Sequence, residues 1–447
     1  MTNQILAGRR SLCPICLTQL DAAVVQRGED VFLEKTCPEH GFFSTIIWRG
    51  DTPSWTNWNS PDEPHSPPKH HTQKEKGCPL DCGLCPDHTA HTCTILFEVT
   101  ERCNLGCPVC FAHSGELSVP DIALGQVKKV FQGIIAAGGP YPLQLSGGEP
   151  TVRDDLPKIV ALAKELGFPH VQINTNGLRI AENISYLHSL KEAGTDLIYL
   201  QMDGTDDGVY RQIRGRALAD VKRKALENCT AVRIGVQLVP TMIRGVNDHQ
   251  LGAIVELAKE FMPTVKGIHF QPVSYFGRFL PMPSNETRMT IPDVLHGLEV
   301  QTGGELKAEH YLPRRKHDAH CGFSAFYILG EDGVLRSATH FYPAKPASKR
   351  SEMTPAEHVR KFITSHSRFI EDDPSECECM RTARLNKALA RAQKYSLSIS
   401  GMPFMDAWTI DLERLKNCCV HVARPDGRII PFCANYLTNR EGVKLYD

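Results

Sequence analysis

Hydrophobic positions between residues 94 and 272 follow two alternating patterns. Short apolar runs typical of buried β-strands are separated by longer segments with the period of a helix that buries one face. Residues 154–167 show the helical pattern, because the apolar positions are 156, 159, 160, 162 and 163. Strands are predicted at 94–100, 142–146, 169–174, 196–202, 232–239 and 266–272, and helices near 121–137, 154–167, 183–193, 218–228 and 247–262. This alternation predicts an α/β domain with a parallel sheet and right-handed crossovers, and leaves open whether the sheet closes into a barrel.

The segments outside this alternation have different patterns. Residues 31–36 alternate within a β-rich N-terminal part, and residues 59–76 are rich in Pro, His and charge, as linkers are. The C-terminal part is less regular, with an amphipathic helix near 380–395. The predicted organisation is therefore a metal-binding module at 1–60, a linker and cysteine loop at 61–93, an α/β core at 94–305 and a C-terminal α+β region at 306–447.

Composition excludes several classes of protein. The chain has 447 residues, with 50 Lys and Arg against 51 Asp and Glu, and 41% of its residues are hydrophobic. These values are typical of a globular protein and give no basic excess for binding nucleic acid. No apolar run is long enough to cross a bilayer, and the N-terminus lacks the apolar stretch of a signal peptide. We therefore expect a cytoplasmic protein without a transmembrane segment that does not bind nucleic acid.

The unusual number is 17 cysteines. A disulfide framework favours small, loop-rich secreted domains, whereas these cysteines occur in groups with the short spacings of metal ligands. In the first group, Cys13, Cys16, Cys37 and His40 form two turns of the Cys-x-x-(Cys/His) type. We expect them to bind one metal ion, either zinc in a structural ribbon or iron as in rubredoxin.

A second group follows directly on the first strand of the α/β core. Cys103, Cys107 and Cys110 supply three thiolates in one short loop. Three thiolates can bind three irons of a cubane cluster and leave the fourth iron open, and a catalytic cluster needs such an open iron. The alternative is a structural zinc site or an electron-transfer site. After the second strand comes Ser146-Gly-Gly-Glu-Pro150, in which two glycines allow close approach of backbone to a ligand and Glu149 offers a carboxylate to an ammonium group.

These paired motifs, Cys-x3-Cys-x2-Cys after strand one and Gly-Gly-Glu-Pro after strand two, resemble those of the radical S-adenosylmethionine (radical SAM) enzymes. Polar residues at the ends of strands three to five fit the same pattern, although the residue before the third cysteine is Val109 where an aromatic is usual. The resemblance implies a partial (β/α)6 TIM-like barrel with a catalytic 4Fe-4S cluster on Cys103, Cys107 and Cys110. The cofactor-binding residues that it implies are Gly147, Gly148, Glu149, Pro150, Asn176, Gln201, Asp203 and Gln237.

The resemblance also implies the chemistry. The open iron would chelate the amino and carboxylate groups of S-adenosylmethionine, with backbone near Gly147 holding the amino group. Reductive cleavage would then give a 5′-deoxyadenosyl radical that abstracts hydrogen from an unreactive carbon. Such an oxygen-sensitive enzyme needs a low-potential electron donor of the ferredoxin or flavodoxin type.

The remaining cysteines predict one or two auxiliary 4Fe-4S clusters. Cys78, Cys82 and Cys85 repeat the catalytic spacing outside the α/β core, and Cys93 is the candidate fourth ligand of a closed electron relay, with structural zinc as the alternative. Asp426-Gly427 predicts a hairpin turn that brings Cys418 or Cys419 close to Cys433. Cys229, alone in a predicted helix, is expected to be a core thiol. The candidate ligands of a C-terminal cluster are Cys321, Cys377, Cys379, Cys418, Cys419 and Cys433.

The order of these motifs narrows the resemblance. It is similar to the order in the group that contains the archaeal dihydropterin (hydroxymethylpterin) methyltransferase and the tetraether lipid synthase. This similarity implies methyl transfer or C–C bond formation on a pterin-like small molecule, with radical coupling of lipid chains as the alternative. A non-catalytic, multi-cluster electron-transfer protein is a further alternative. No Asp-x-His-x-x-Gly motif of cobalamin binding is present.

Overall fold

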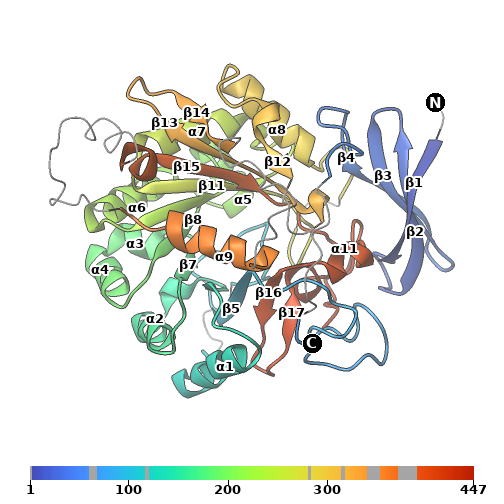
Figure 1. Ribbon diagram of the computed structural model, residues 1–447, viewed down its shortest axis with the longest axis horizontal. Helices are drawn as coiled ribbons and strands as arrows, with labels where there is room; N and C mark the ends of the chain where they lie inside the picture. The colour runs from blue at the N-terminus through green and yellow to red at the C-terminus, as the bar shows by residue number, and fades with distance from the viewer. Residues whose placement is uncertain are drawn as a thin grey trace.

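The chain contains two β-sheets (Figure 1). The computed structural model describes residues 3–59, 68–115, 120–279, 283–313, 318–339, 353–370 and 390–446. In these residues, a four-stranded antiparallel sheet near the N-terminus packs beside a large mixed sheet. Most of the predicted helix at 380–395 and part of the predicted linker at 59–76 lie outside the described residues.

The elements follow one another in chain order. The strands are β1 Asn3–Leu12, β2 Gln19–Arg27, β3 Asp30–Cys37, β4 Gly41–Trp48, β5 Thr94–Thr100, β6 Leu143–Gly147, β7 Val171–Thr175, β8 Leu197–Gln201, β9 Gly235–Val239, β10 Thr241–Met242, β11 Val265–Pro272, β12 Leu312–Pro313, β13 Phe323–Leu329, β14 Leu335–Ser337, β15 Ser396–Gly401, β16 Val420–Ala423 and β17 Ile429–Pro431. The helices are α1 Leu124–Ala136, α2 Leu156–Glu165, α3 Leu178–Glu182, α4 Ile184–Glu192, α5 Asp207–Arg214, α6 Ala219–Val232, α7 Leu251–Glu260, α8 Ile291–Gln301, α9 Pro355–His366, α11 Leu412–Lys416 and α12 Phe432–Asn435, with short 3-10 turns at Pro150–Val152, Asp248–Gln250, Ala308–His310 and Ala319–Cys321.

The parallel core confirms the predicted (β/α)6 order. Strands β5, β6, β7, β8, β9 and β11 lie side by side and run parallel, with helices between them. The periodic segment at 154–167 forms α2, which buries Leu156, Ile159, Val160 and Ala163 against the sheet, as its pattern predicts. Successive side chains of each strand point to opposite faces, so one set packs under the helices and the other faces the inside of the curved sheet.

Strands from the last third of the chain extend both edges of this core. β15 adds to β11 in parallel, and β16 adds to β5 in parallel. The antiparallel partner β17 follows β16 through the predicted turn at Asp426-Gly427, which confirms the hairpin. The sheet thus remains open in the described residues, with β12 at one edge and β17 at the other, which gives a partial barrel.

Helix α9 lies across the gap between the two halves of the curved sheet (orange in Figure 1). In the middle of α9, Arg360 donates hydrogen bonds to the carbonyl of Thr92, just before β5, at 2.7 and 2.9 Å. In its C-terminal half, Phe362 and His366 pack against Phe326 of β13. The helix therefore covers the open side of the barrel.

The N-terminal sheet is joined to the body by buried polar contacts. The Ser11 hydroxyl donates to the carbonyl of Ile410 at 2.5 Å, and the Lys35 ammonium donates to the carbonyl of Ala407 at 2.8 Å. Arg9 and Asp411 form an ion pair at 2.9 Å. Because Lys35 is only 2% exposed, its charge depends on these polar partners.

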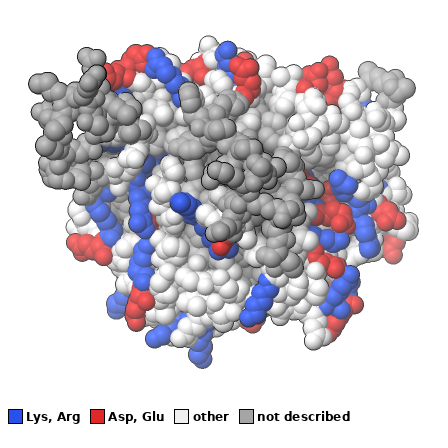
Figure 2. Space-filling model, viewed as in Figure 1, with Lys and Arg blue, Asp and Glu red and all other residues white. Residues whose placement is uncertain are grey.

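Basic and acidic side chains are interspersed on the face of the molecule shown in Figure 2. This distribution agrees with the net charge of −1. Among the described residues, no helix has the length and apolar composition needed to cross a membrane.

Candidate active site

The three cysteines of the catalytic motif lie at the wall of one cavity. Cys103, Cys107 and Cys110 follow β5 at the carboxyl edge of the parallel strands, and all three line a cavity of about 700 Å³. Ligands usually bind at this edge of parallel α/β folds. Burial raises the pKa of the Cys103 thiol to about 12, so metal binding must displace a firmly held proton there.

Two glycines bring the second motif against this loop. The Gly148 amide donates to the carbonyl of Thr100 at 2.9 Å, and the Glu149 amide donates to the carbonyl of Arg102 at 2.8 Å. A Cβ atom at Gly147 would lie 2.1 Å from the Thr100 oxygen, and one at Gly148 would lie 2.2 Å from the Arg102 oxygen. Only glycine therefore permits the contact that places Gly-Gly-Glu-Pro beside the cysteine loop.

The Glu149 carboxylate is held by hydrogen bonds within the protein. One carboxylate oxygen accepts from the Thr151 amide and hydroxyl and from the Thr175 hydroxyl, and the other accepts from the Asn176 amide at 2.6 Å. The side chain is 1% exposed, and burial raises the pKa of its carboxyl group. Glu149 also lines the cavity, and its contact with an ammonium group stays a prediction. The carboxylate ties the loop after β6 to the loop after β7.

Two arginines that the sequence analysis did not identify hold the cysteine loop. Arg214 at the end of α5 donates to the carbonyl of Val109 at 3.1 Å, and Arg278 donates to the carbonyl of Cys107 at 2.7 Å. Arg278 also exchanges two backbone hydrogen bonds with Cys110. Arginine is usually solvated, so its residue type gave no signal. The one local feature that marks Arg214 is its place as the last residue of α5, before Gly215.

The other predicted cofactor residues divide into two sets. Asn176, Gln201 and Gln237 line the cavity. The side-chain amide of Asn176 donates to the side-chain oxygen of Asn104 in the cysteine loop at 2.7 Å. Asp203 instead forms a bidentate ion pair with Arg214 at 2.7 and 2.8 Å and is fully buried. Asp203 therefore positions Arg214, which in turn supports the cysteine loop.

The cavity continues from the cysteine loop into the barrel, where polar side chains lie among a larger number of apolar ones. The Gln144 amide donates to Asn174 at 2.6 Å, and Asn174 donates to the Ser146 hydroxyl at 3.2 Å. Among the described residues that line the cavity, Glu149 is the single acidic one. The polar residues inside include Gln144, Ser146, Gln172, Asn174, Tyr199, Gln237, Lys266, His269, Gln271, Ser324, His358, His366, Ser398 and Ser400.

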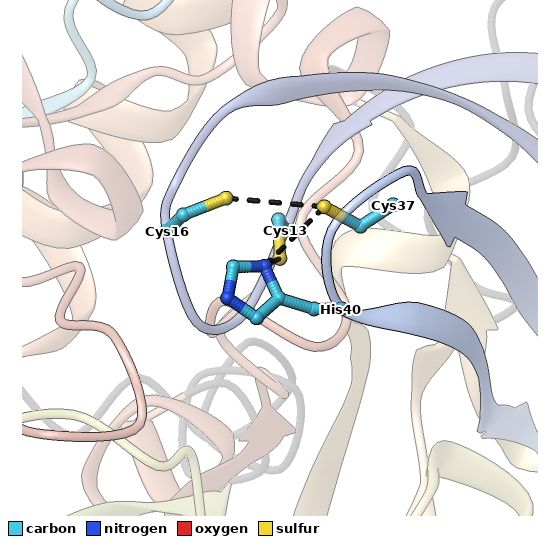
Figure 3. Close-up of side chains that lie close together, drawn as sticks. All are labelled: Cys13, Cys16, Cys37 and His40. Atoms are coloured by element: carbon cyan, nitrogen blue, oxygen red, sulfur yellow. Dashed lines mark hydrogen bonds between the residues drawn. The ribbon is translucent and has the colours of Figure 1, made fainter.

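The N-terminal group is brought together as predicted (Figure 3). The candidate ligand atoms of Cys13, Cys16, Cys37 and His40 all lie within 4.8 Å of one another. Nδ1 of His40 is 3.4 Å from the Cys37 sulfur and 3.7 Å from the Cys13 sulfur. Burial raises the pKa of Cys13 to about 11, whereas the Thr18 hydroxyl lowers the pKa of Cys16 to about 6. Three sulfurs and one imidazole nitrogen form a tetrahedral ligand set.

Cys78, Cys82 and Cys85 also lie near one another, but Cys93 does not join them as a ligand. The Cys82 side chain raises the pKa of Cys78 through a hydrogen bond, and the charge of Cys82 contributes to the raised pKa of Cys85. Cys93 forms a disulfide with Cys419, with a Cα–Cα distance of 5.3 Å. The parallel register pairs Thr94 with Val420, so the residues that precede these two strands are neighbours. The prediction for Cys93 is therefore corrected.

Among the C-terminal cysteines too, some lie together as candidate ligands and one forms the disulfide instead. Cys321, Cys418 and Cys433 lie near one another, because the charges of Cys433 and Cys321 both raise the pKa of the buried Cys418 thiol. Cys419 points to Cys93 instead, which corrects its predicted place in this group. Cys377 and Cys379 lie outside the described residues. Cys229 is fully buried in α6, as expected for a core thiol.

Comparisons with known proteins agree with this geometry. The family described as the radical SAM superfamily matches residues 97–258, and the HMPTM N-terminal zinc ribbon domain matches residues 5–49. The chain belongs to the radical SAM superfamily.

One relative matches along nearly the whole chain. The 7,8-dihydro-6-hydroxymethylpterin dimethyltransferase of Methanocaldococcus jannaschii is 37% identical over 97% of this chain and 94% of its own length. The GTP 3′,8-cyclase of Chlorobaculum tepidum is 30% identical over 48% of this chain and 66% of its own length. Among solved structures, Streptococcus suis SuiB bound to precursor peptide SuiA gives a TM-score of 0.41 at 16% identity, with 48% of this chain and 46% of that chain covered.

Proposed function

We propose that this radical SAM enzyme transfers a methyl group to a pterin-like small molecule. The similarity to the Methanocaldococcus jannaschii dimethyltransferase extends over both the barrel and the flanking cysteine-rich regions. The observation that carries the proposal is the group of carboxamide and hydroxyl side chains on the wall formed by β6 to β9, within an otherwise largely apolar cavity, which suits a flat heterocycle with several hydrogen-bonding groups.

The residues at the carboxyl edge fit the cluster and its cosubstrate. Cys103, Cys107 and Cys110 supply three thiolates on one cavity wall, and the backbone of Gly147 and Gly148 lies beside them. A bound cluster with S-adenosylmethionine would supply a 5′-deoxyadenosyl radical able to remove hydrogen from an unreactive carbon. The protein holds the loop with Arg214 and Arg278, positions the substrate and encloses the reaction.

One wall of the cavity carries the groups that a heterocycle needs. Gln144 and Gln172 are paired across β6 and β7, and Tyr199 is paired with Gln237 across β8 and β9. Carboxamides both donate and accept hydrogen bonds, as the ring nitrogens, amino group and carbonyl of a pterin require.

Three further cysteine groups supply the remaining metal sites of the proposal. The Cys3His set at Cys13 binds one zinc or iron ion. Cys78, Cys82 and Cys85 hold one auxiliary 4Fe-4S cluster, and Cys321, Cys418 and Cys433 hold another. These clusters would pass electrons from a low-potential donor of the ferredoxin or flavodoxin type.

Anaerobic turnover tests the proposal. The protein is reconstituted with iron and sulfide and then incubated with dithionite, 6-hydroxymethyl-7,8-dihydropterin and excess S-adenosylmethionine, of which one molecule would supply the radical and a second the methyl group. We expect 5′-deoxyadenosine and a pterin heavier by one methyl group or more, both measured by mass spectrometry. Cys103→Ala should form neither product, whereas the matched variant Cys229→Ala should keep both, because Cys229 lies in α6 and outside the cavity lining.

The outcomes separate the alternatives. Absence of 5′-deoxyadenosine from the reconstituted wild type would support an electron-transfer protein and refute the catalytic proposal. Formation of 5′-deoxyadenosine only with glycerol ether lipids, and not with the pterin, would favour lipid coupling. Equal product from Cys103→Ala would refute the assignment of the catalytic ligands.

A further inference from the structure

A buried lysine lies at the end of the cavity that is opposite the cysteine loop. Lys266 is the second residue of β11, and its side chain lines the cavity although the residue is only 3% exposed. The cysteine loop is at the carboxyl edge of the parallel strands, so Lys266 lies near their amino edge. Six residues of extended strand separate it from Pro272, about 20 Å along the strand.

The ammonium group of Lys266 has a carbonyl partner but no acidic one within the described residues. Its Nζ atom donates to the carbonyl of Lys394 at 3.0 Å. No carboxylate of the described part of the chain forms an ion pair with it, and burial lowers its pKa to about 8. A buried ammonium without a counter-charge is costly, because one carbonyl replaces only part of its hydration.

The other described groups around this end are basic or neutral. His269 lies further along β11, with Nδ1 2.9 Å from the hydroxyl of Ser400. His366, at the end of α9, stacks on Phe362 with ring centroids 4.5 Å apart, and the charge of Lys266 contributes to its lowered pKa. Lys394 lies close enough for its charge to contribute to the lowered pKa of Lys266. Basic groups thus lie together at this end of the cavity, whereas Glu149, the one acidic residue among the described lining residues, is beside the cysteine loop.

We propose that the Lys266 end of the cavity binds an anionic substituent, phosphate or carboxylate, of the substrate. The inference rests on the proposed function, since it assumes that the heterocycle lies between this end and the cysteine loop. The ammonium group would gain the counter-charge that the described residues do not provide. The carboxamides of β6 and β7 would contact the uncharged ring, so the two ends of the substrate would meet walls of different chemistry.

Binding measurements with three matched pterins test this inference. The probes are 6-hydroxymethyl-7,8-dihydropterin, its phosphate monoester and 6-carboxy-7,8-dihydropterin, titrated anaerobically into the reconstituted enzyme by calorimetry. We expect at least one anionic probe to bind about tenfold or more tightly than the neutral one, because a hydrogen bond between charged groups is stronger than a neutral one. The comparison of the two anionic probes distinguishes phosphate from carboxylate.

Substitutions at Lys266 separate charge from packing. Lys266→Met should remove the preference for the anionic probe while leaving affinity for the neutral probe within about threefold, and Lys266→Arg should retain much of the preference. Lys224→Met, which alters an exposed ion pair on α6, is the matched control and should behave as wild type. Thermal unfolding of each variant shows whether it is folded.

The inference is overturned if wild type binds all three pterins equally, or if folded Lys266→Met keeps the preference. Methylation assays on the same three probes keep the two proposals separate. Lack of methylation of every probe would refute the proposed function. The affinity ratios would still report on the charge at Lys266.

Discussion

Replacing Gly148 with alanine adds one methyl group, which should push the Gly-Gly-Glu-Pro loop away from the cysteine loop. The Cβ atom of Gly148→Ala would lie 2.2 Å from the carbonyl oxygen of Arg102 and 2.7 Å from its carbon. Both atoms are backbone, so no side chain can rotate away, and the loops must move apart by close to an ångström. That movement breaks the hydrogen bonds from the Gly148 and Glu149 amides.

The expected cost follows from these contacts. Overpacking of a rigid contact costs about 1–3 kcal/mol, and each lost backbone hydrogen bond costs about 1 kcal/mol. We therefore expect Gly148→Ala to lower the free energy of unfolding by about 3–5 kcal/mol. The same displacement moves the backbone that leads to Cys103, so formation of 5′-deoxyadenosine should fall at least about a hundredfold even in the folded fraction.

Urea unfolding followed by circular dichroism and a 5′-deoxyadenosine assay measure the two effects. Gly133→Ala is the matched control, because Gly133 lies within α1 and a Cβ there meets nothing within 4 Å. That variant should be more stable by about 0.5–1 kcal/mol, with unchanged activity. A Gly148→Ala protein with wild-type stability and activity would refute the argument from close approach.

Three other substitutions test separate parts of the structure. His40→Ala should lower bound metal by about one ion per chain in elemental analysis, and a loss no larger than that of His70→Ala would contradict the Cys3His site. Cys433→Ser should lower iron by about four per chain relative to wild type, whereas Cys229→Ser should not; equal iron in both would exclude a cluster at Cys433. Burial lowers the pKa of His170 to about 4, below that of an unfolded histidine, so the folded state binds fewer protons and loses stability as pH falls. The free energy of unfolding should drop by about 2 kcal/mol from pH 7 to pH 5, and this part of the pH dependence should vanish in His170→Phe; parallel pH profiles would contradict it.

The local patterns of the chain predicted the parallel core because each strand–helix unit buries its own apolar face. The helix that starts after Asp155 is an example, with all its buried positions on one face. By contrast, β15 and β16 join strands that are more than a hundred residues earlier, and their short apolar runs do not specify a partner. Such pairings depend on the shape of the completed sheet.

In the candidate site too, the features set by short spacings in the sequence were predictable, and those set by long-range pairing were not. The spacing of Cys103, Cys107 and Cys110 is a local feature, and so is the tetrad at Cys13, because each turn presents two ligands. Cys93 was assigned to the group nearest in sequence, whereas the register of β5 and β16 places it beside Cys419. The supporting role of Arg214 depends on its ion pair with Asp203, eleven residues away, which no periodic pattern records.

The pairing of β16 with β5 has a consequence for synthesis of the protein on the ribosome. β5 leads into the cysteine loop, yet one of its two neighbours, β16, begins at Val420. During translation, the edge of β5 therefore stays without this partner for more than three hundred residues after β5 has been made. We therefore expect the strand that leads into the cysteine loop to gain its second neighbour only after Ala423 has been made, well after the loop itself.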